Sequence, residues 1–427
     1  MSAIANGANI VFWGVITFSI LVVLHEGGHF LAAKAFKVKV HEFMIGLPGP
    51  ALRVRSKKSG TAFGVTIIPL GGYVRIAGME PGPEDPLLGP VLAAVTRARR
   101  TNALELSTGL NASASQIEAA LVTLADWGAI APAEDDADSY VALMDESLAD
   151  DPDELLAQAR AVTYRGLPTL KRIALLSAGV AVNLAMAIAV FTFVITVFGY
   201  YQPSLTIEKT VSDGAAAAAG LRAGDRIVAV DGETLRDWGK FTAVISQHEP
   251  GDEIEVRFMR DQTERSVVAV LGAREDGTAV LGVQSEIEFV RPGVVGAFVD
   301  SLKWTGVVFQ AVADLFRPST FRQTLAGAMS VVGISVEVAR VVRNGPLDYA
   351  WLVAFLSLSL GVMNLLPIPP LDGGKVVLEV IERIAGRPLP RKLAYGLNAA
   401  GMILLLTLVG YLIYADVMRL AGHSISG

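Results

Sequence analysis

The sequence predicts a polytopic α-helical membrane protein with a four-helix transmembrane core. Hydrophobic residues make up 52% of the 427 residues, above the ~45–50% typical of soluble domains, and they concentrate in a few long blocks. A membrane helix needs ~20 mostly apolar residues, and four blocks meet this requirement. These blocks cover approximately residues 10–36, 173–200, 349–366 and 397–414.

The composition excludes several kinds of site. The formal net charge of -6 gives no general support for nucleic-acid binding. The chain has no cysteine, so disulfides and thiolate ligands are excluded, and any metal must be held by His, Asp or Glu. We expect no cleavable signal peptide, because the first apolar block ends in ionisable residues and lacks a small-residue cleavage site.

Two further apolar stretches, 294–316 and 321–342, are interrupted by charged and amide side chains. This pattern favours amphipathic helices that lie at the membrane surface or pack on the helix bundle. The sequence leaves open whether they span the membrane. If they spanned as a pair, the sidedness of the rest of the chain would be unchanged.

Basic residues beside the apolar blocks predict the orientation, because cytoplasmic loops are rich in Lys and Arg. We expect three basic segments in the cytoplasm: after the first block, before the second, and between the third and fourth. Their basic residues are Lys34, Lys37, Lys39, Arg53, Arg55, Lys57, Lys58, Arg165, Lys171, Arg172, Arg383, Arg387, Arg391 and Lys392. The N-terminus, the segment between the second and third blocks, and the C-terminus are then outside.

The first cytoplasmic loop is predicted to contain a membrane-associated β-hairpin. Residues 51–54, 62–68 and 73–76 are β-prone, and turn residues separate them. The middle strand is apolar on both faces, so it could dip toward the membrane. It could do so only beside protein or water, because open strand edges are costly in lipid.

Residues 205–286 predict a small α/β domain. A short alanine-rich helix between Gly214 and Gly220 separates two strand-like segments, and Asp231-Gly232 marks a tight turn. The strand-like segments of this domain are 205–211, 226–230, 254–259 and 266–271.

His25, Glu26 and His29 fit the pattern H-E-x-x-H at the end of the first apolar block. Residues four apart share one face of a helix, so both imidazoles can bind one zinc ion, and Glu26 can take a proton from a water on that ion. The alternative is that three polar residues merely mark an interfacial helix end. Ionisable groups inside a membrane segment are costly and usually functional, which favours the metal site.

A catalytic zinc needs a third protein ligand and an open position for water. Asp372 is the best candidate, because prolines at 367, 369 and 370 break the preceding helix and Gly373-Gly374 loosen the chain there. Taken alone, Asp372 is better explained as the cap of a helix over 375–384, but its combination with the histidine pair favours a metal ligand.

The remaining histidines compete less well for this role. His248 and His423 lie in segments expected outside, on the wrong side of the membrane. His41 is too near in sequence to the first pair to be an obvious ligand, but it is not excluded.

With these motifs in place, the chain resembles the site-two protease family of intramembrane zinc metalloproteases, close to the bacterial regulator-of-sigma-E type. The motifs occur in a characteristic order and cover most of the chain outside roughly 81–162. They are His25 to His29, Gly60-Thr61 through Pro69-Leu70-Gly71-Gly72-Tyr73-Val74, Ala178-Gly179 to Asn183, and Asn364 to Gly374. Within the α/β domain, residues 214–232 are similar to PDZ domains of membrane proteases, and one such module fits.

The resemblance implies one catalytic Zn²⁺, with His25, His29 and Asp372 as ligands and Glu26 as general base. It also implies that Asn364 and the hairpin hold the substrate backbone, the hairpin by β-addition to an unwound strand. The hairpin residues concerned are Phe63, Gly64, Val65, Gly71 and Gly72. Plain structural roles, a ribbon for the hairpin and an interhelical hydrogen bond for Asn364, are the alternatives.

The resemblance further implies regulated intramembrane proteolysis in a bacterial cytoplasmic (inner) membrane. The substrate would be the transmembrane segment of a single-span protein, such as an anti-sigma factor or a remnant signal peptide, reached from surrounding lipid. The active site would lie near the cytoplasmic side. The PDZ-like domain would lie outside, as a size filter or as a docking site for a partner's tail.

Residues 81–162 are not expected from the resemblance. Two helix-like segments, 102–107 and 112–125, and two β-prone segments, 127–130 and 140–143, suggest a winged-helix-like insert. We expect no nucleic-acid binding, because the second helix has no Lys or Arg. The presumed wing is acidic as well. A cytoplasmic protein-binding or regulatory insert and a merely tolerated surface insertion are equally compatible with the sequence.

The expected divisions of the chain follow from these assignments. They are 8–80 for the first transmembrane helix and hairpin, 81–162 for the insert, 163–202 for the second transmembrane helix, 203–290 for the PDZ-like domain, 291–345 for the amphipathic helices, and 346–427 for the third and fourth transmembrane helices.

Two functions compete with proteolysis. One is a non-catalytic membrane scaffold that binds partners through its PDZ-like part. The other is a divalent metal transporter, since ionisable residues inside membrane helices can line an ion path. Against transport, the ionisable groups cluster at one end of the helices.

Overall fold

The computed structural model describes residues 3–69, 71–80, 82–136, 138–274 and 277–421. The chain divides into two compact units. Unit 1 comprises Met1–Phe191 and Asp300–Gly427, and unit 2 comprises Thr192–Val299.

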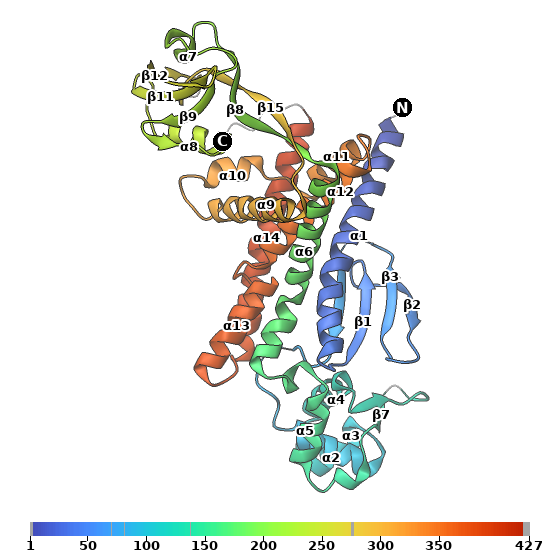
Figure 1. The fold of residues 1–427 in the computed structure, drawn as a ribbon. Helices are drawn as coiled ribbons and strands as arrows, with labels where there is room; N and C mark the ends of the chain where they lie inside the picture. Colours follow the sequence, from blue (N-terminus) through green and yellow to red (C-terminus); the bar gives the residue numbers. More distant parts are fainter. Residues whose placement is uncertain (1–2, 70, 81, 137, 275–276, 422–427) are drawn as a thin grey trace. The chain divides into compact units, whose positions relative to one another are not determined.

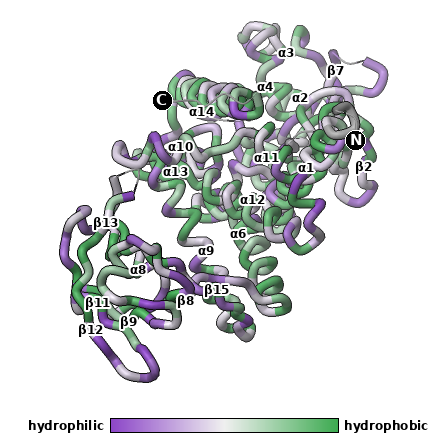
Figure 2. Tube along the Cα trace, turned by 90° about the horizontal axis from the view of Figure 1, so that it is seen from above, coloured by the Kyte–Doolittle hydropathy of each residue, from purple (hydrophilic) through white to green (hydrophobic). Residues whose placement is uncertain are grey.

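Among the described residues, four helices are long and apolar enough to cross a membrane. They are α1 (Ala3–Ala35, apolar from Gly7), α6 (Thr169–Phe198), α12 (Pro346–Asn364) and α14 (Arg391–Leu420). The four apolar blocks lie within these helices or extend at most two residues beyond their C-terminal ends, so four candidate spanning helices lie where the sequence predicted them. Figure 1 shows them as long rods, and Figure 2 shows that hydrophobic residues predominate along α6 and α14.

The two interrupted apolar stretches also form helices. α9 (Val294–Asp314) is not among the spanning candidates. α10 (Phe321–Gly327) and α11 (Val331–Val341) qualify only as a pair, and the pair is bent by 52° at a short break. Asp416 of α14 stabilises this break, because its Oδ2 accepts hydrogen bonds from the backbone N–H groups of Ser330 and Gly333 at 2.6 and 3.2 Å.

The loop after α1 forms a four-stranded sheet in the order β2-β3-β1-β4, not a simple hairpin. Its strands are β1 (Val40–Ile45), β2 (Ala51–Arg55), β3 (Ala62–Thr66) and β4 (Gly72–Ile76). β1 pairs parallel with β3 and antiparallel with β4. The sheet lies against α1 through β1 and β4 (Figure 1).

A small buried cluster ties the end of α1 to this sheet and to the start of α6. It consists of Ala33, Val38, Val40, Ile76, Leu167 and Leu175. Each of these side chains is at most 7% exposed, so the cluster excludes water from the joint between the three elements. This joint positions the C-terminal turns of α1, where the histidine pair lies.

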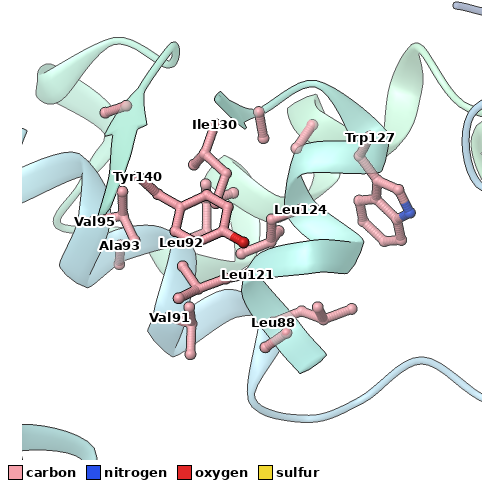
Figure 3. Packing of buried hydrophobic residues seen from close by; sticks show 14 of the residues in the cluster. Leu88, Val91, Leu92, Ala93, Val95, Leu121, Leu124, Trp127, Ile130 and Tyr140 are labelled. Carbon is pink, nitrogen blue, oxygen red and sulfur yellow. The ribbon is translucent and has the colours of Figure 1, made fainter. Parts of the chain in front are cut away.

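The insert has its own hydrophobic core, in which buried side chains such as Leu92, Leu121 and Ile130 pack together (Figure 3). Its three-stranded sheet has the order β5-β7-β6. Its elements are α2 (Leu88–Ala98), β5 (Arg100–Asn102), α3 (Ala103–Leu110), α4 (Ala114–Trp127), β6 (Ile130–Pro132), β7 (Ser139–Ala142), the 3₁₀ turn η1 (Glu146–Leu148) and α5 (Pro152–Ala161). Asn102 caps α3, and Ser113 with Gln116 forms a capping box on α4. The two predicted helices are present, whereas α2 and α5 were not predicted.

Unit 2 is a small α/β domain, as the sequence predicted. Its main sheet has the strand order β12-β11-β9-β8-β15, and β10 pairs with β9. The elements are β8 (Tyr200–Thr210), α7 (Ala215–Ala218), β9 (Arg226–Val230), β10 (Glu233–Thr234), α8 (Trp238–Ile245), β11 (Glu253–Arg260), β12 (Thr263–Val270), β13 (Gly272–Ala273), β14 (Ala279–Val280) and β15 (Val283–Val290). Asp225 is 1% exposed and is paired with Arg260, which secures the turn that leads into β9.

Candidate metal centre

Three buried side chains from distant parts of the sequence meet at the C-terminal end of α1. Asp372 Oδ2 lies 3.0 Å from His25 Nε2 and 3.0 Å from His29 Nε2. The two Nε2 atoms are 3.4 Å apart, and the three residues are 6–8% exposed. Within the described part of the chain, this is the group of His, Asp and Glu side chains whose ligand atoms could surround one metal ion, all lying within 4.8 Å of one another.

His29 is oriented by a backbone contact with α6. Its Nδ1 lies 2.9 Å from the carbonyl oxygen of Leu175. A carbonyl oxygen can only accept a hydrogen bond, so Nδ1 carries the proton and Nε2 keeps a lone pair for a metal. Such a partner on the far nitrogen is typical of metal-binding histidines.

His25 is oriented by a second residue of α6. The side-chain amide of Asn183, which is 0% exposed, lies with its Nδ2 3.3 Å from His25 Nδ1, and its Oδ1 is buried without a hydrogen-bond partner. A half-turn of this amide lets Oδ1 accept the Nδ1 proton of His25. That arrangement satisfies the buried oxygen and leaves the lone pair of Nε2 available to a metal.

Asp372 begins α13 (Asp372–Ala385), directly after the break that follows α12. Gly373 and Gly374 allow the chain to double back there, because an added Cβ at either position would lie 2.2 Å from Leu365 O or 2.3 Å from Pro369 N. Lys375 Nζ lies 3.4 Å from Asp372 Oδ1, the oxygen that faces away from the histidines. The tight turn and the ammonium group therefore point Oδ2 toward the imidazoles.

α1 and α6 approach closely where the histidines lie. An added Cβ at Gly28 would lie 2.4 Å from Ala178 O, and one at Gly179 would lie 2.5 Å from His29 Nε2 and 2.8 Å from His25 Cε1. Distances below 3 Å are not sterically acceptable. The absence of side chains at Gly28 and Gly179 therefore gives the two imidazoles their space.

Glu26 lies beside the edge of the four-stranded sheet. An added Cβ at Gly72, the first residue of β4, would be 3.8 Å from Glu26 Cγ and 2.7 Å from Val22 Cγ1. The bare backbone at Gly72 therefore lets β4 run directly along α1 next to Glu26. A carboxylate, a metal-binding group and a strand edge are thereby close together.

The donor set fits zinc. Two imidazole nitrogens and one carboxylate oxygen are ligands that Zn²⁺ accepts, and three protein ligands leave a fourth position open, as in catalytic zinc sites. The orientation of both imidazoles by partners on their far nitrogens matches what a preformed metal site requires.

The hairpin residues do not all lie where β-addition requires them. β3, which contains Phe63, Gly64 and Val65, is paired on one side with β1 and on the other with β2. The expectation that these three residues offer a free backbone edge is therefore wrong, because both edges of β3 are already occupied. Within the described residues β4 pairs with β1 alone, so β4, which starts at Gly72 directly after Gly71, is an edge strand.

Two other predicted candidates have partners elsewhere. The Asn364 amide Nδ2 donates to the Leu360 carbonyl oxygen one turn earlier in α12, at 3.0 Å. His41 Nε2 is bonded instead to the backbone carbonyl of Asp126 in the insert, and it is absent from the three-residue group. His41 is thus placed outside the candidate centre.

Residues 13–408 match Peptidase family M50. This chain belongs to Peptidase family M50. The match extends over most of the sequence and includes α1 from residue 13 onward, the insert, unit 2 and α13. It confirms the predicted resemblance to site-two proteases.

The M50 relatives cover nearly the whole chain. "Zinc metalloprotease RasP" of Geobacillus kaustophilus is 26% identical over 416 residues, which is 95% of this chain and 97% of the relative. "Probable protease eep" of Enterococcus faecalis is 27% identical over 421 residues, 95% of this chain and 98% of the relative. The protein is accordingly a zinc metalloprotease, its cofactor is zinc, and its apolar helices make it a multi-pass membrane protein.

Among solved structures, one similar chain is the PDZ domain of an SdrC-like protein from Listeria monocytogenes. It is 23% identical, covers 19% of this chain and 87% of its own length, and gives a TM-score of 0.19. A second PDZ domain, from an SdrC-like protein of Listeria innocua, is 21% identical, covers 21% of this chain and 99% of its own length, with a TM-score of 0.19.

Several residues of this M50 centre have roles that the sequence alone did not suggest. Asn183 and Gly179 fall in a motif quoted for the resemblance, but no contact with the histidines was predicted for them. Small residues on an apolar helix, as at Ala178-Gly179, indicate close helix contact and could have suggested the approach of α1. The carbonyl group of Leu175 leaves no trace in the sequence.

Proposed function

We propose that His25, His29 and Asp372 hold the catalytic zinc, that Glu26 is the general base, and that the protein cleaves peptide bonds inside the membrane segments of single-span proteins. One observation carries this proposal: the three ligand atoms converge within 4.8 Å at the end of a helix long enough to span a membrane. Glu26 precedes His29 by three residues on that helix, as a base beside the metal requires.

Zinc, when bound, supplies Lewis-acid chemistry: it polarises the peptide carbonyl and makes water more acidic. The protein's own residues do the rest. Glu26 takes a proton from the attacking water and delivers it to the departing amine. Leu175 and Asn183 keep the two imidazoles in the tautomer that leaves Nε2 free.

A membrane helix hides its peptide bonds in its own hydrogen bonds, so a substrate must be locally unwound before water can attack. The edge strand β4 offers new partners to the freed backbone groups by β-addition. Gly72, in this edge strand, lies beside Glu26. The residue before it, Gly71, has a φ of 90°. We assign substrate-backbone binding to Gly71, Gly72 and the following residues of β4, with Asn364 as a further candidate.

Connectivity supports a four-span topology. α6 starts and α12 ends at the metal-binding group, because Leu175 and Asp372 both contact His29. The far ends of α6 and α12 are then on one side, so the chain between them crosses the membrane an even number of times. This favours a re-entrant or surface-lying α10–α11 pair over a fifth span.

We assign the metal centre to the cytoplasmic side of a bacterial inner membrane and unit 2 to the outside, because the basic loops favour this orientation. Unit 2 would act as a PDZ-type domain, either as a size filter for trimmed substrates or as a docking site for a partner's tail. The alanine-rich helix α7 and the Gly224-Asp225-Arg226-Ile227 turn into β9 support this assignment. An anti-sigma factor or a remnant signal peptide, cut in regulated intramembrane proteolysis, is the proposed substrate class.

For the insert we propose a cytoplasmic regulatory or protein-binding role without nucleic acid. Its exposed wing is acidic, with Asp135 and Asp136 paired to Arg100. Replacing residues 81–162 with a short linker and measuring cleavage tests this role. Unchanged rate and substrate choice would leave only a tolerated surface insertion.

The experiment that tests the proteolytic function compares wild type with Glu26→Gln on a single-span reporter protein in lipid vesicles, with and without a zinc chelator. We expect cleavage by wild type alone, loss of cleavage with the chelator, and recovery when zinc is restored. Glu26→Gln should retain zinc but not cleave. Absence of cleavage by zinc-loaded wild type would instead support the non-catalytic scaffold, and equal cleavage by Glu26→Gln would overturn the assignment of Glu26 as general base.

A further inference from the structure

Glu379 is a buried carboxylate on α13 that the proposed reaction does not use. It is 8% exposed, and it lies seven residues, or two helical turns, after Asp372 on the same face of the helix. A buried carboxylate is costly unless it is paired and hydrogen-bonded. The identity of its partners therefore indicates what this residue does.

Both oxygens of Glu379 are bound by the segment that leads into α6. Oε1 accepts a hydrogen bond from Arg172 Nη1 at 3.1 Å, and Oε2 accepts one from the Tyr164 hydroxyl at 3.0 Å. Burial and the adjacent Glu379 carboxylate raise the pKa of Tyr164 well above its ordinary value, so this hydroxyl remains a donor. α13 is thus fastened to α6 and to the turn η2 (Tyr164–Gly166) before it.

Arg172 is itself held in one orientation. Its Nε donates to the Leu167 carbonyl oxygen at 2.8 Å, and its Nη2 donates to the Arg165 carbonyl oxygen at 2.6 Å. The guanidinium group is planar, so fixing two of its nitrogens also fixes the direction of Nη1 toward Glu379.

These contacts form a closed chain of interactions that includes the metal-binding residues. Arg172 lies one turn before Leu175, whose carbonyl oxygen binds His29. His29 Nε2 meets Asp372 Oδ2, and α13 connects Asp372 to Glu379, which returns to Arg172. Glu379 therefore fixes α13 against α6 at a second point, ~10 Å along the helix from Asp372.

We propose that Glu379 is a positioning residue for the metal centre: with Arg172 and Tyr164 it holds α13 where Asp372 meets the two histidines. The inference rests on the proposed zinc ligands. Groups that orient metal ligands typically change metal affinity 10- to 100-fold when they are removed. Glu379 acts through the helix, because its two oxygens are bound to Arg172 and Tyr164 and not to the metal-binding group.

The surroundings allow the network to be altered without a steric clash. A cavity of about 730 Å³ adjoins it and is lined in part by Tyr164, Arg172, Lys375 and Glu379. Isosteric or smaller side chains at these positions therefore have room.

The test measures the rate at which zinc leaves the full-length purified protein when an excess of chelator is added, alongside kcat and KM. We expect Glu379→Gln and Arg172→Gln to release zinc at least about tenfold faster, with kcat lowered and KM unchanged. Tyr164→Phe, which keeps the Arg172–Glu379 pair, should show a smaller change, and Arg172→Lys should recover part of the loss. The double variant should resemble either single variant, because both remove one interaction.

Arg383→Gln is the matched control, since Arg383 is exposed on the same helix and has no ion pair among the described residues. Its zinc release should equal that of wild type. Unchanged zinc release in folded Glu379→Gln, or an equal effect of Arg383→Gln, overturns the proposal. If Glu379→Gln does not fold, unchanged release from Tyr164→Phe and Arg172→Lys overturns it.

Failure of the ligand assignment gives a different result. If Asp372→Asn binds zinc as wild type does, the proposed centre itself is wrong. If Asp372→Asn loses zinc while Glu379→Gln does not, the positioning role alone fails.

Discussion

Asp372 Oδ2 lies 3.0 Å from His29 Nε2, although 343 positions separate these residues in the sequence. α1 and α13 contribute one residue each to this contact, and α6 orients the histidine through Leu175. The metal centre therefore depends on how three helices are held together.

Gly179→Ala should disrupt the metal centre by a steric clash, without changing any metal-binding residue. The added methyl group would lie 2.5 Å from His29 Nε2, so an imidazole or α6 must move. We expect a loss of about 1–3 kcal/mol in unfolding free energy from overpacking, together with weaker zinc binding. Zinc content and thermal unfolding of the purified variant measure both effects.

Gly27→Ala is the matched control for this change. It lies in the same stretch of α1, but an added Cβ there has nothing within 4 Å. Zinc binding should be unchanged, and stability should rise by up to about 1 kcal/mol because alanine favours helix. Similar zinc loss in both variants would contradict the steric account.

Gly72→Ala should impair substrate handling and leave the zinc in place. Its methyl group would lie 2.7 Å from Val22 Cγ1 and 2.8 Å from Met44 O, so β4 must shift away from α1. We expect a raised KM or lowered kcat on a single-span reporter. Gly49→Ala, which has open space around it in the same loop, should behave as wild type. Normal kinetics for Gly72→Ala would argue against β4 as the substrate edge.

Asp126→Ala should loosen the insert from the four-stranded sheet. The carboxylate accepts hydrogen bonds from Gly78 N at 2.9 Å and Arg75 Nη2 at 3.2 Å, which connects the end of α4 to β4 and the residues after it. A charge-assisted hydrogen bond is worth about 1.5–3 kcal/mol. We expect faster proteolysis within the insert at unchanged zinc content. The exposed Glu134→Ala should not have this effect, and equal cleavage rates would refute the role of Asp126.

Acidification should weaken the contact between the insert and the four-stranded sheet, because His41 of β1 is bonded to Asp126 of the insert. Burial lowers the pKa of His41 below its ordinary value, and this outweighs the raising effects of the Asp126 carbonyl group and carboxylate. The unfolded state therefore binds a proton more readily than the folded state, so the stabilisation is complete above about pH 6.5 and is lost as the pH falls toward the lower folded-state pKa. The protection of amides near Gly78 against hydrogen exchange, relative to their intrinsic exchange rate at each pH, should fall over this range in wild type. If His41→Gln shows the same pH dependence, another group is responsible.

Patterns of residues close together in the sequence predicted much of this structure. The features that were not predicted depend on contacts between segments that are distant in the sequence. The four spanning helices follow from long apolar blocks, and the pairing of His25 with His29 follows from helical spacing. β1 was not predicted, because its polar His41 and Glu42 interrupt the apolar pattern and its partners β3 and β4 come later in the chain.

The assignment of a substrate edge to β3 failed for the same reason. An apolar strand next to turns resembles a hairpin edge, but the order of strands in a sheet depends on pairing that local sequence does not specify. The packing of Gly179 on the histidines, the carbonyl group of Leu175 and the partners of Glu379 likewise depend on tertiary contacts.

X-ray absorption at the zinc edge, on the uncleaving Glu26→Gln protein, tests the assigned ligand set most directly. The account predicts one zinc with two imidazole nitrogens and oxygen ligands at about 2.0–2.2 Å, and loss of this spectrum in Asp372→Asn. Zinc bound with the same coordination when Asp372 is replaced, or a spectrum without the two imidazoles, would contradict it.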